Sequence, residues 1–224
     1  MNENLVYFLI VIGAIAAYFI GSINTAIIIS KYLSGEDIRD MGSGNAGMTN
    51  VMRNYGKKAG VLTLVCDMVK GILSVTIMTL MLRAVGCDDY KIIIIAQYVA
   101  CLFAVLGHIF PAYYKFRGGK GIAVCVGSIL FVDFRVALTC LGVFIVLLLI
   151  TKMVSVGSIF AIAMFPVTTI IYQMLVTNSG TAIPNAIIAL IVAIIIIAKH
   201  HENISRIISG TERKIGEKKE EENG

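Results

Sequence analysis

The sequence predicts an all-α protein that crosses a membrane about seven times. Hydrophobic residues make up 58% of its 224 residues and charged residues only 15%, whereas roughly a quarter of the residues in a soluble domain are charged. Apolar stretches recur along the chain at about the 20 residues that a helix needs to cross a bilayer. Basic residues concentrate in alternate connecting segments, which is the pattern of a multi-pass topology.

Six stretches are long enough to span a bilayer as helices. They cover residues 5–29, 60–82, 92–112, 136–151, 154–176 and 182–199. A seventh stretch, 119–133, is shorter, so it either spans with shielding from its neighbours or only re-enters. We prefer seven spans, with six as the alternative. The first stretch is not expected to be a cleavable signal peptide, because its flank carries no basic residue and its apolar run is too long.

The basic residues predict the orientation of the bundle. With seven spans and the N-terminus outside, the inner segments are 30–59, 113–118, 152–153 and 200–224. Fifteen of the nineteen Lys and Arg residues then lie at the inner face and three at the outer face. This bias places the C-terminus in the cytoplasm, and it explains the net charge of +5 without a nucleic-acid partner. We expect residues 1–212 to form one integral membrane domain and 213–224 a disordered, charged cytoplasmic tail.

Residues 113–121, Tyr-Tyr-Lys-Phe-Arg-Gly-Gly-Lys-Gly, form a basic, glycine-rich turn between two apolar stretches. Glycine permits positive φ and lets backbone N–H groups approach a ligand closely. Three cations, Lys115, Arg117 and Lys120, complete a turn that suits a phosphate. The nucleotide-binding pattern Gly-x-x-x-x-Gly-Lys-Ser/Thr is absent. The alternative is a positive inner loop whose glycines let two helices pack closely.

A second polar segment, residues 37–53, lies in the longest inner loop. Its glycines bracket Ser43 and Asn45, and from Thr49 onward the pattern predicts a short helix that carries Arg53. A phosphate bound here would receive backbone N–H groups, the Ser43 hydroxyl and a bidentate guanidinium. The alternative is a capped surface loop without a ligand.

A third polar segment, residues 199–206, follows the last span. Its His200 and His201 could act as an acid, a base or a hydrogen-bond donor to a phosphate, or could simply lie at the membrane interface. Isoleucines at helical spacing follow, namely Ile204, Ile207 and Ile208. They predict an amphipathic helix on the bilayer surface.

Charges and cysteines inside the spans have a structural interpretation. Asp67 and Lys70 are three residues apart on one face of the second predicted helix. Because unpaired charges are costly in lipid, we expect them to pair with each other or to face a polar site, and we favour pairing over catalysis.

The five cysteines include no Cys-x-x-Cys pair and no spacing typical of a metal site.

The three polar segments, in this order, resemble those of the bacterial acyl-phosphate:glycerol-3-phosphate acyltransferases (PlsY family). The resemblance rests on Gly-Ser at 21–22, Gly-Ser-Gly-Asn-Ala-Gly-Met-Thr-Asn at 42–50, Gly-His-Ile-Phe-Pro at 107–111, Phe-Arg-Gly-Gly-Lys-Gly at 116–121, His-His-Glu-Asn-Ile at 200–204 and Gly-Thr-Glu at 210–212. It covers nearly the whole chain. One departure is Met48, where the family commonly has alanine.

The resemblance implies an activity. An acyl phosphate would donate its fatty acyl chain to the sn-1 hydroxyl of glycerol 3-phosphate, giving 1-acylglycerol 3-phosphate (lysophosphatidic acid) and phosphate, in phospholipid biosynthesis. It also implies a bacterial cell membrane location, membrane lipid as a partner and an active site on the cytoplasmic face. No cofactor, metal, nucleic acid or obligate protein partner is expected.

The resemblance also implies the site residues. The expected catalytic residues are Ser43, Arg53, Lys120, His200 and Asn203. The expected substrate-binding residues are Gly42, Gly44, Asn45, Thr49, Asn50, Gly118, Gly119, Gly121 and Ser155. No His-x-x-x-x-Asp dyad is present. Catalysis is therefore expected to rest on positioning of the substrates and on electrostatic stabilisation of the carbonyl oxyanion and the departing phosphate. The preferred general base is a substrate phosphate, with His200 as the alternative.

A transporter or channel for an organic phosphate is the competing class of protein. It could use the same basic turns and the same number of spans. The missing internal repeat and the uniformly apolar stretch 186–198 argue against it.

Overall fold

A computed structural model of the protein describes residues 3–176 and 180–215. Within these residues every regular element is a helix. The α-helices are α1 (Glu3–Ser22), α2 (Thr25–Ser34), α3 (Met48–Ala84), α4 (Tyr90–Ile109), α5 (Ile122–Val132), α6 (Phe134–Thr151), α7 (Val154–Leu175), α8 (Ala182–Ala198) and α9 (His201–Ile208), with 3₁₀ turns η1 (Ile38–Asp40) and η2 (Ala112–Tyr114). The predicted all-α fold class is confirmed.

Five stretches of the described chain are long and apolar enough to cross a membrane. They are Glu3–Ser34, Met48–Ala84, Tyr90–Tyr114, Phe134–Thr151 and Val154–Leu175. Helices α8 and α9 add a sixth if they are counted together, although they are bent by 60° relative to each other. The predicted seventh span contains only α5, whose 11 residues rise about 16 Å. That length is short of the roughly 30 Å hydrocarbon core, so α5 does not span by itself.

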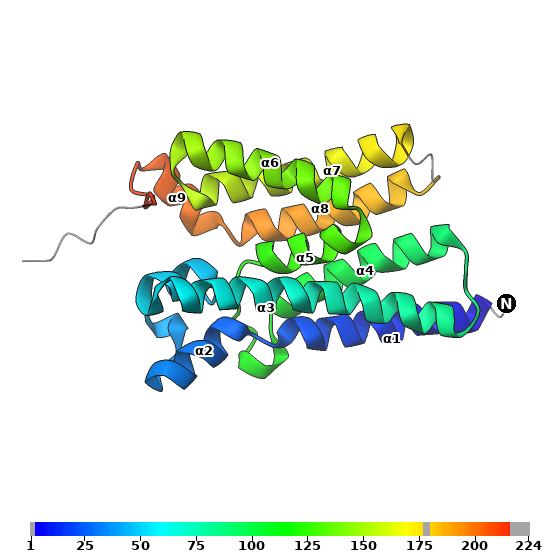
Figure 1. Ribbon diagram of the computed structural model, residues 1–224, viewed down its shortest axis with the longest axis horizontal. Coiled ribbons are helices and arrows are strands. Elements are labelled where there is room, and N and C mark those ends of the chain that lie inside the picture. Colours follow the sequence, from blue (N-terminus) through cyan, green and yellow to red (C-terminus); the bar gives the residue numbers. More distant parts are fainter. Residues whose placement is uncertain (1–2, 177–179, 216–224) are drawn as a thin grey trace, which may run out of the picture.

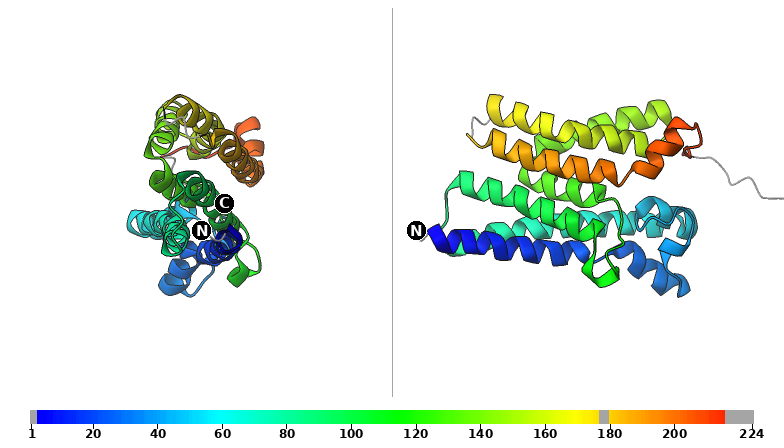
Figure 2. Two further views of the ribbon diagram at one scale, coloured as in Figure 1. Left: turned by 90° about the vertical axis from the view of Figure 1, so that its right-hand side faces the viewer. Right: turned by 180° about the vertical axis from the view of Figure 1, so that it is seen from behind.

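The helices form a bundle with α5 near its centre (Figures 1 and 2). Helices α1, α3 and α4 pack together on one side, and α6, α7 and α8 pack on the other. Helix α5 contacts α3, α4 and α6, and α4 also contacts α8. The short helix therefore joins the two sides, and only Leu130 and Phe131 near its end are exposed.

Glycines at helix crossings make this packing possible. A Cβ atom on Gly127 of α5 would lie 2.1 Å from the carbonyl oxygen of Met68 in α3, and one on Gly71 of α3 would lie 2.3 Å from the Val124 carbonyl oxygen. Small residues let helix backbones approach closely in membrane proteins. The close contact between the two backbones holds α5 against α3. It therefore sets the position of the helix that follows the basic turn.

Helix α3 combines the short helix predicted from Thr49 and the second predicted span. Gly56 interrupts it with a φ of 85° and a ψ of 174°, an extended positive-φ conformation that glycine adopts without the steric cost of a Cβ atom. Residues 48–55 therefore form a short helical segment with its own direction. This segment carries Arg53.

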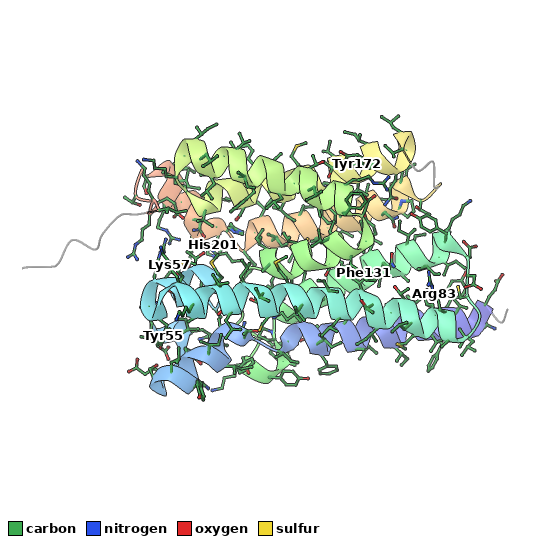
Figure 3. All side chains as sticks on the ribbon, in the orientation of Figure 1. Tyr55, Lys57, Arg83, Phe131, Tyr172 and His201 are labelled. Carbon is green, nitrogen blue, oxygen red and sulfur yellow. The ribbon has the colours of Figure 1, made fainter. Side chains whose placement is uncertain are left out.

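Two of the polar segments, 37–53 and 199–206, lie at one end of the bundle, opposite to the N-terminal end (Figure 1). The start of α3, the α6–α7 connection and α9 all lie there. Figure 3 shows Lys57 and His201 at this end and Arg83 and Tyr172 towards the other. The predicted disordered tail falls mostly on residues outside the described part of the chain. Of residues 213–215, Ile215 donates its N–H to the Lys152 carbonyl at 2.8 Å.

Candidate active site

A cavity of about 700 Å³ opens at this end of the bundle. Its polar part is formed by the loop before α3, the first turns of α3, Lys120 and α9, together with the residues that follow α9. Its apolar part continues between α3, α5, α6 and α7. One cavity therefore joins a charged mouth to an apolar groove.

All five residues expected to be catalytic line this cavity: Ser43, Arg53, Lys120, His200 and Asn203. Of those expected to bind substrate, Gly42, Asn45, Thr49, Asn50, Gly121 and Ser155 also line it. Gly44, Gly118 and Gly119 do not. Residues more than 150 positions apart in the sequence thus face one space.

Glu212 organises the mouth of the cavity. Its Oε1 accepts hydrogen bonds from the Ser155 hydroxyl and from Asn203 Nδ2, both at 2.7 Å, and its Oε2 accepts from Arg206 Nε at 2.8 Å. The Lys120 ammonium in turn donates to Asn203 Oδ1. One carboxylate therefore connects the start of α7, helix α9 and the basic turn before α5.

The environment of Glu212 keeps it ionised. Burial alone raises the pKa of this carboxyl, but the hydrogen bonds from Ser155, Arg206 and Asn203 outweigh burial, so that its pKa is lowered. The carboxylate offsets part of the positive charge of the mouth. The sequence indicates Glu212 only as part of the Gly-Thr-Glu motif at 210–212 and predicts no role for it.

Arg53 has no carboxylate within ion-pair distance among the described residues. It lines the cavity from the short helical segment before Gly56. Its guanidinium thus keeps its donors available for an anion, and a guanidinium can hold two oxygens of a phosphate at once.

Lys120 is the one cation of the basic turn 113–121 that lines the cavity. Burial lowers the pKa of Lys120 to about 8. Lys115 and Arg117, which were expected to share in phosphate binding, lie outside it. The turn is instead held by Arg39, whose Nη1 donates to the carbonyl oxygens of Tyr114 and Arg117 at 2.8 and 3.0 Å.

Gly118 and Gly119 lie in packing contacts outside the cavity lining. Their N–H groups donate to the carbonyl oxygens of Ile109 and His108, both at 3.1 Å, so in this structure they are engaged within the protein. A Cβ on Gly118 would lie 1.9 Å from the His108 carbonyl oxygen, and one on Gly119 would lie 2.3 Å from His108 Nε2. These glycines allow close packing on the end of α4, which is the alternative that the sequence left open. Gly121, with a φ of 89°, does line the cavity.

Asn50 supports the glycine-rich loop before α3. Its Nδ2 donates to the Ile38 and Met41 carbonyls at 3.1 and 2.9 Å. Its Oδ1 accepts from the Ser43 N–H and from Asn54 Nδ2, both at 3.1 Å. Through these hydrogen bonds the Asn50 side chain holds in place the loop that carries Ser43. Gly44 serves the same loop, because its N–H donates to the Met41 carbonyl at 2.9 Å.

His200, and not His201, belongs to the cavity. His200 is buried and its Nδ1 lies 2.8 Å from the Ile196 carbonyl oxygen. A carbonyl can only accept, so Nδ1 carries the proton and Nε2 is left as an acceptor. Burial lowers the pKa of His200 to about 4, which leaves the ring neutral at pH 7. His201 is exposed.

Asp67 and Lys70 pair, as the sequence predicted. Lys70 Nζ lies 2.9 Å from Asp67 Oδ1 and also donates to the Ile23 carbonyl at 2.8 Å. The same Nζ lies 2.8 Å from Nδ1 of His108. Burial of this ion pair is tolerated because each charge has close partners. Asp67 and His108 also line the cavity, a position that sequence reasoning did not assign to His108.

Metal ligands are not assembled in the described part of the chain. Across residues 3–176 and 180–215, no group of three His, Cys, Asp or Glu side chains is arranged to hold a metal ion.

Comparison with known proteins identifies the family. The sequence model of the family described as "Glycerol-3-phosphate acyltransferase" matches residues 11–210. This chain belongs to the glycerol-3-phosphate acyltransferase family. The resemblance noted in the sequence is thereby confirmed, and the protein is an acyltransferase of a multi-pass membrane type.

Relatives of similar length support the assignment. The glycerol-3-phosphate acyltransferase of Clostridioides difficile (strain 630) is 43% identical over 210 residues, covering 94% of this chain and 97% of the relative. That of Thermoanaerobacter sp. (strain X514) is 39% identical over 210 residues, covering 94% and 98%. The chain therefore matches nearly the full length of both relatives.

Solved structures of the family share the fold. The crystal structure of PlsY (YgiH), an integral membrane glycerol 3-phosphate acyltransferase, in its glycerol 3-phosphate form has a TM-score of 0.76 and 33% identity, covering 92% of this chain and 96% of that one. Its lysophosphatidic acid form has a TM-score of 0.73 and 31% identity, covering 92% and 95%.

Proposed function

We propose that the protein transfers a fatty acyl group from acyl phosphate to the sn-1 hydroxyl of glycerol 3-phosphate, giving 1-acyl-sn-glycerol 3-phosphate and phosphate. The observation that carries this proposal is the single cavity that joins a cationic mouth to an apolar groove. Both substrates carry phosphate, and one of them also carries a long acyl chain. The names of the related proteins and of the two solved forms agree with glycerol 3-phosphate as acceptor.

The mouth supplies more than one cation for two phosphates. Arg53, Lys120, Arg206 and Arg213 line it, and Glu212 pairs with Arg206. We assign Ser43 and Arg53 to phosphate contact, as the family motif implies. Lys120 lines the cavity and donates to Asn203, and its ammonium can stabilise the negative charge that develops on the carbonyl oxygen and the departing phosphate.

The groove supplies a place for the acyl chain. Its walls are aliphatic and aromatic side chains of α3, α5, α6 and α7, among them Leu64, Met68, Val126, Leu141, Phe144 and Ile162. Burial of apolar surface there contributes about 25 cal/mol for each Å² removed from water. The bound acyl chain therefore anchors the acyl phosphate so that its acyl carbon lies near the mouth.

The reaction needs positioning and charge stabilisation. The sn-1 oxygen attacks the acyl carbon, the bond from that carbon to the phosphate oxygen breaks, and phosphate leaves with the electron pair. The hydroxyl proton passes to a base, for which we propose a substrate phosphate. His200 has the lowered pKa of a weak base, so we place it as a hydrogen-bonding partner through Nε2. An acyl phosphate is already activated, and no cofactor enters this scheme.

The pH profile of His200→Ala is expected to separate the two bases. If substrate phosphate is the base, wild type and variant both show an acidic limb of kcat/KM near pH 6, where the second phosphate ionisation lies. The variant should be only about 10-fold slower, because it loses one hydrogen bond. A histidine base would instead give the wild type a limb near its pKa of about 4, and that limb would vanish in the variant. His201→Ala serves as the control.

We further propose that the mouth faces the cytoplasm of a bacterial cell membrane. The bias of Lys and Arg towards this end supports that orientation, and glycerol 3-phosphate is a water-soluble substrate. Residues 1–212 would act as one domain without an obligate protein partner.

Purified protein in detergent tests the reaction. We expect phosphate release from acyl phosphate that requires glycerol 3-phosphate and yields the 1-acyl product by mass spectrometry. Arg53→Ala is the inactive control. A transporter would instead move glycerol 3-phosphate into liposomes without releasing phosphate from the donor, and this outcome would refute the proposed reaction.

A further inference from the structure

We propose that Phe165, held by Tyr98, forms the floor of the apolar groove and limits the length of the acyl chain that the enzyme accepts. This inference rests on the proposed function, because it assigns the groove to the acyl chain. It goes beyond that function by naming the side chains that set substrate preference.

Phe165 lies at the deep end of the cavity. The residues of α7 that line the cavity begin at Val154 in the mouth and end at Phe165, and eleven residues of helix rise about 16 Å. The deepest lining residues of α5 and α6 are Ile129 and Ala137. These three side chains are buried, with exposed fractions of 2% for Phe165, 3% for Ile129 and 6% for Ala137. The groove is thus closed at this depth.

A stacked ring supports the floor from behind. The rings of Phe165 and Tyr98 are nearly parallel, with an interplanar angle of 10° and centroids 6.0 Å apart. Tyr98, on α4, has an exposed fraction of 1% and does not line the cavity. For Phe165 to swing away from an incoming chain, Tyr98 would have to move as well.

Hydrogen bonds keep Tyr98 in place. Its hydroxyl lies 3.3 Å from Thr169 Oγ1 and accepts from Gln173 Nε2 at 3.2 Å. Gln173 Oε1 accepts from Asn185 Nδ2 at 2.8 Å and from the Thr181 hydroxyl at 3.2 Å. This buried polar network joins α4, α7 and α8. Breaking it in an apolar interior is costly, because freed polar groups find no water there.

A rigid floor makes the reaction rate depend on the length of the acyl chain. A chain longer than the groove cannot push the floor down, so its acyl carbon stays too far towards the mouth. Displacing a reacting atom by about 1 Å can cost 10²-fold in rate. We therefore expect the wild type to lose activity sharply beyond one chain length, and to tolerate shorter chains.

The test compares Phe165→Ala with wild type on saturated acyl phosphates that increase in length by one ethylene unit. Removing the ring should raise the ratio of kcat/KM for the first rejected chain over the preferred chain by about 10-fold or more, as for a methylene admitted to a closed pocket. The matched control is Phe160→Ala, on the same helix but 56% exposed and outside the cavity. It should leave the length profile unchanged.

A second variant changes the floor in the opposite direction. Ala137→Leu fills the deep end, so it should shift preference towards shorter chains, and it keeps the idea testable if Phe165→Ala does not fold. An unchanged length profile in a folded Phe165→Ala or Ala137→Leu enzyme would overturn the floor assignment. Failure of the wild type to use any acyl phosphate would overturn the proposed function instead.

Discussion

Replacing Arg53 by lysine is expected to lower kcat/KM by about 30- to 1000-fold, which corresponds to roughly 2–4 kcal/mol. The variant keeps the positive charge, but an ammonium cannot reproduce the bidentate fork of a guanidinium on a phosphate. In the described structure Arg53 faces the cavity without a carboxylate partner. Its donors are therefore free for substrate.

The measurement is kcat/KM determined separately with each substrate as the limiting one. The substrate whose kcat/KM falls more identifies the phosphate that Arg53 binds. Arg83→Lys, at the opposite end of the bundle, is the matched control and should retain full activity (Figure 3). A folded Arg53→Lys enzyme with unchanged kcat/KM for both substrates would show that Arg53 does not hold a phosphate.

Replacing Lys120 by methionine is expected to lower kcat/KM by about 10²- to 10³-fold, because the site loses a cation that stabilises developing negative charge. The ionisation of Lys120 also predicts an alkaline limb in the pH profile of wild-type kcat/KM. Burial lowers the pKa of Lys120 to about 8, so the ammonium form is complete well below pH 8 and is lost as the pH rises through that value. Wild-type kcat/KM should therefore fall above about pH 8.

Lys120→Arg provides the sharper readout. A guanidinium stays protonated across this range, so the variant should lose the alkaline limb even if its geometry makes it slower. Lys115→Met, in the same turn but outside the cavity, should keep both the rate and the limb. An alkaline limb that stays at the same pH in Lys120→Arg would assign that ionisation to another group.

The sequence by itself predicted most of the long helices and several of the residues that meet in the cavity. Apolar length is a local property, so the predicted spans 92–112, 154–176 and 182–199 coincide closely with α4, α7 and α8. Motif order identified the family, and the expected catalytic residues indeed share one cavity. The pairing of Asp67 with Lys70 followed from the cost of isolated charges in an apolar helix.

Other features were decided only by tertiary structure, because they depend on which distant atoms meet. The sequence of Gly118 and Gly119 suits a phosphate cradle, and only the close approach of His108 shows that packing uses their N–H groups. The length of stretch 119–133 left open whether it spans, and the packing of α5 against α3 gave it a short central helix instead. Glu212 became the centre of the mouth only when α7 and α9 came together around it.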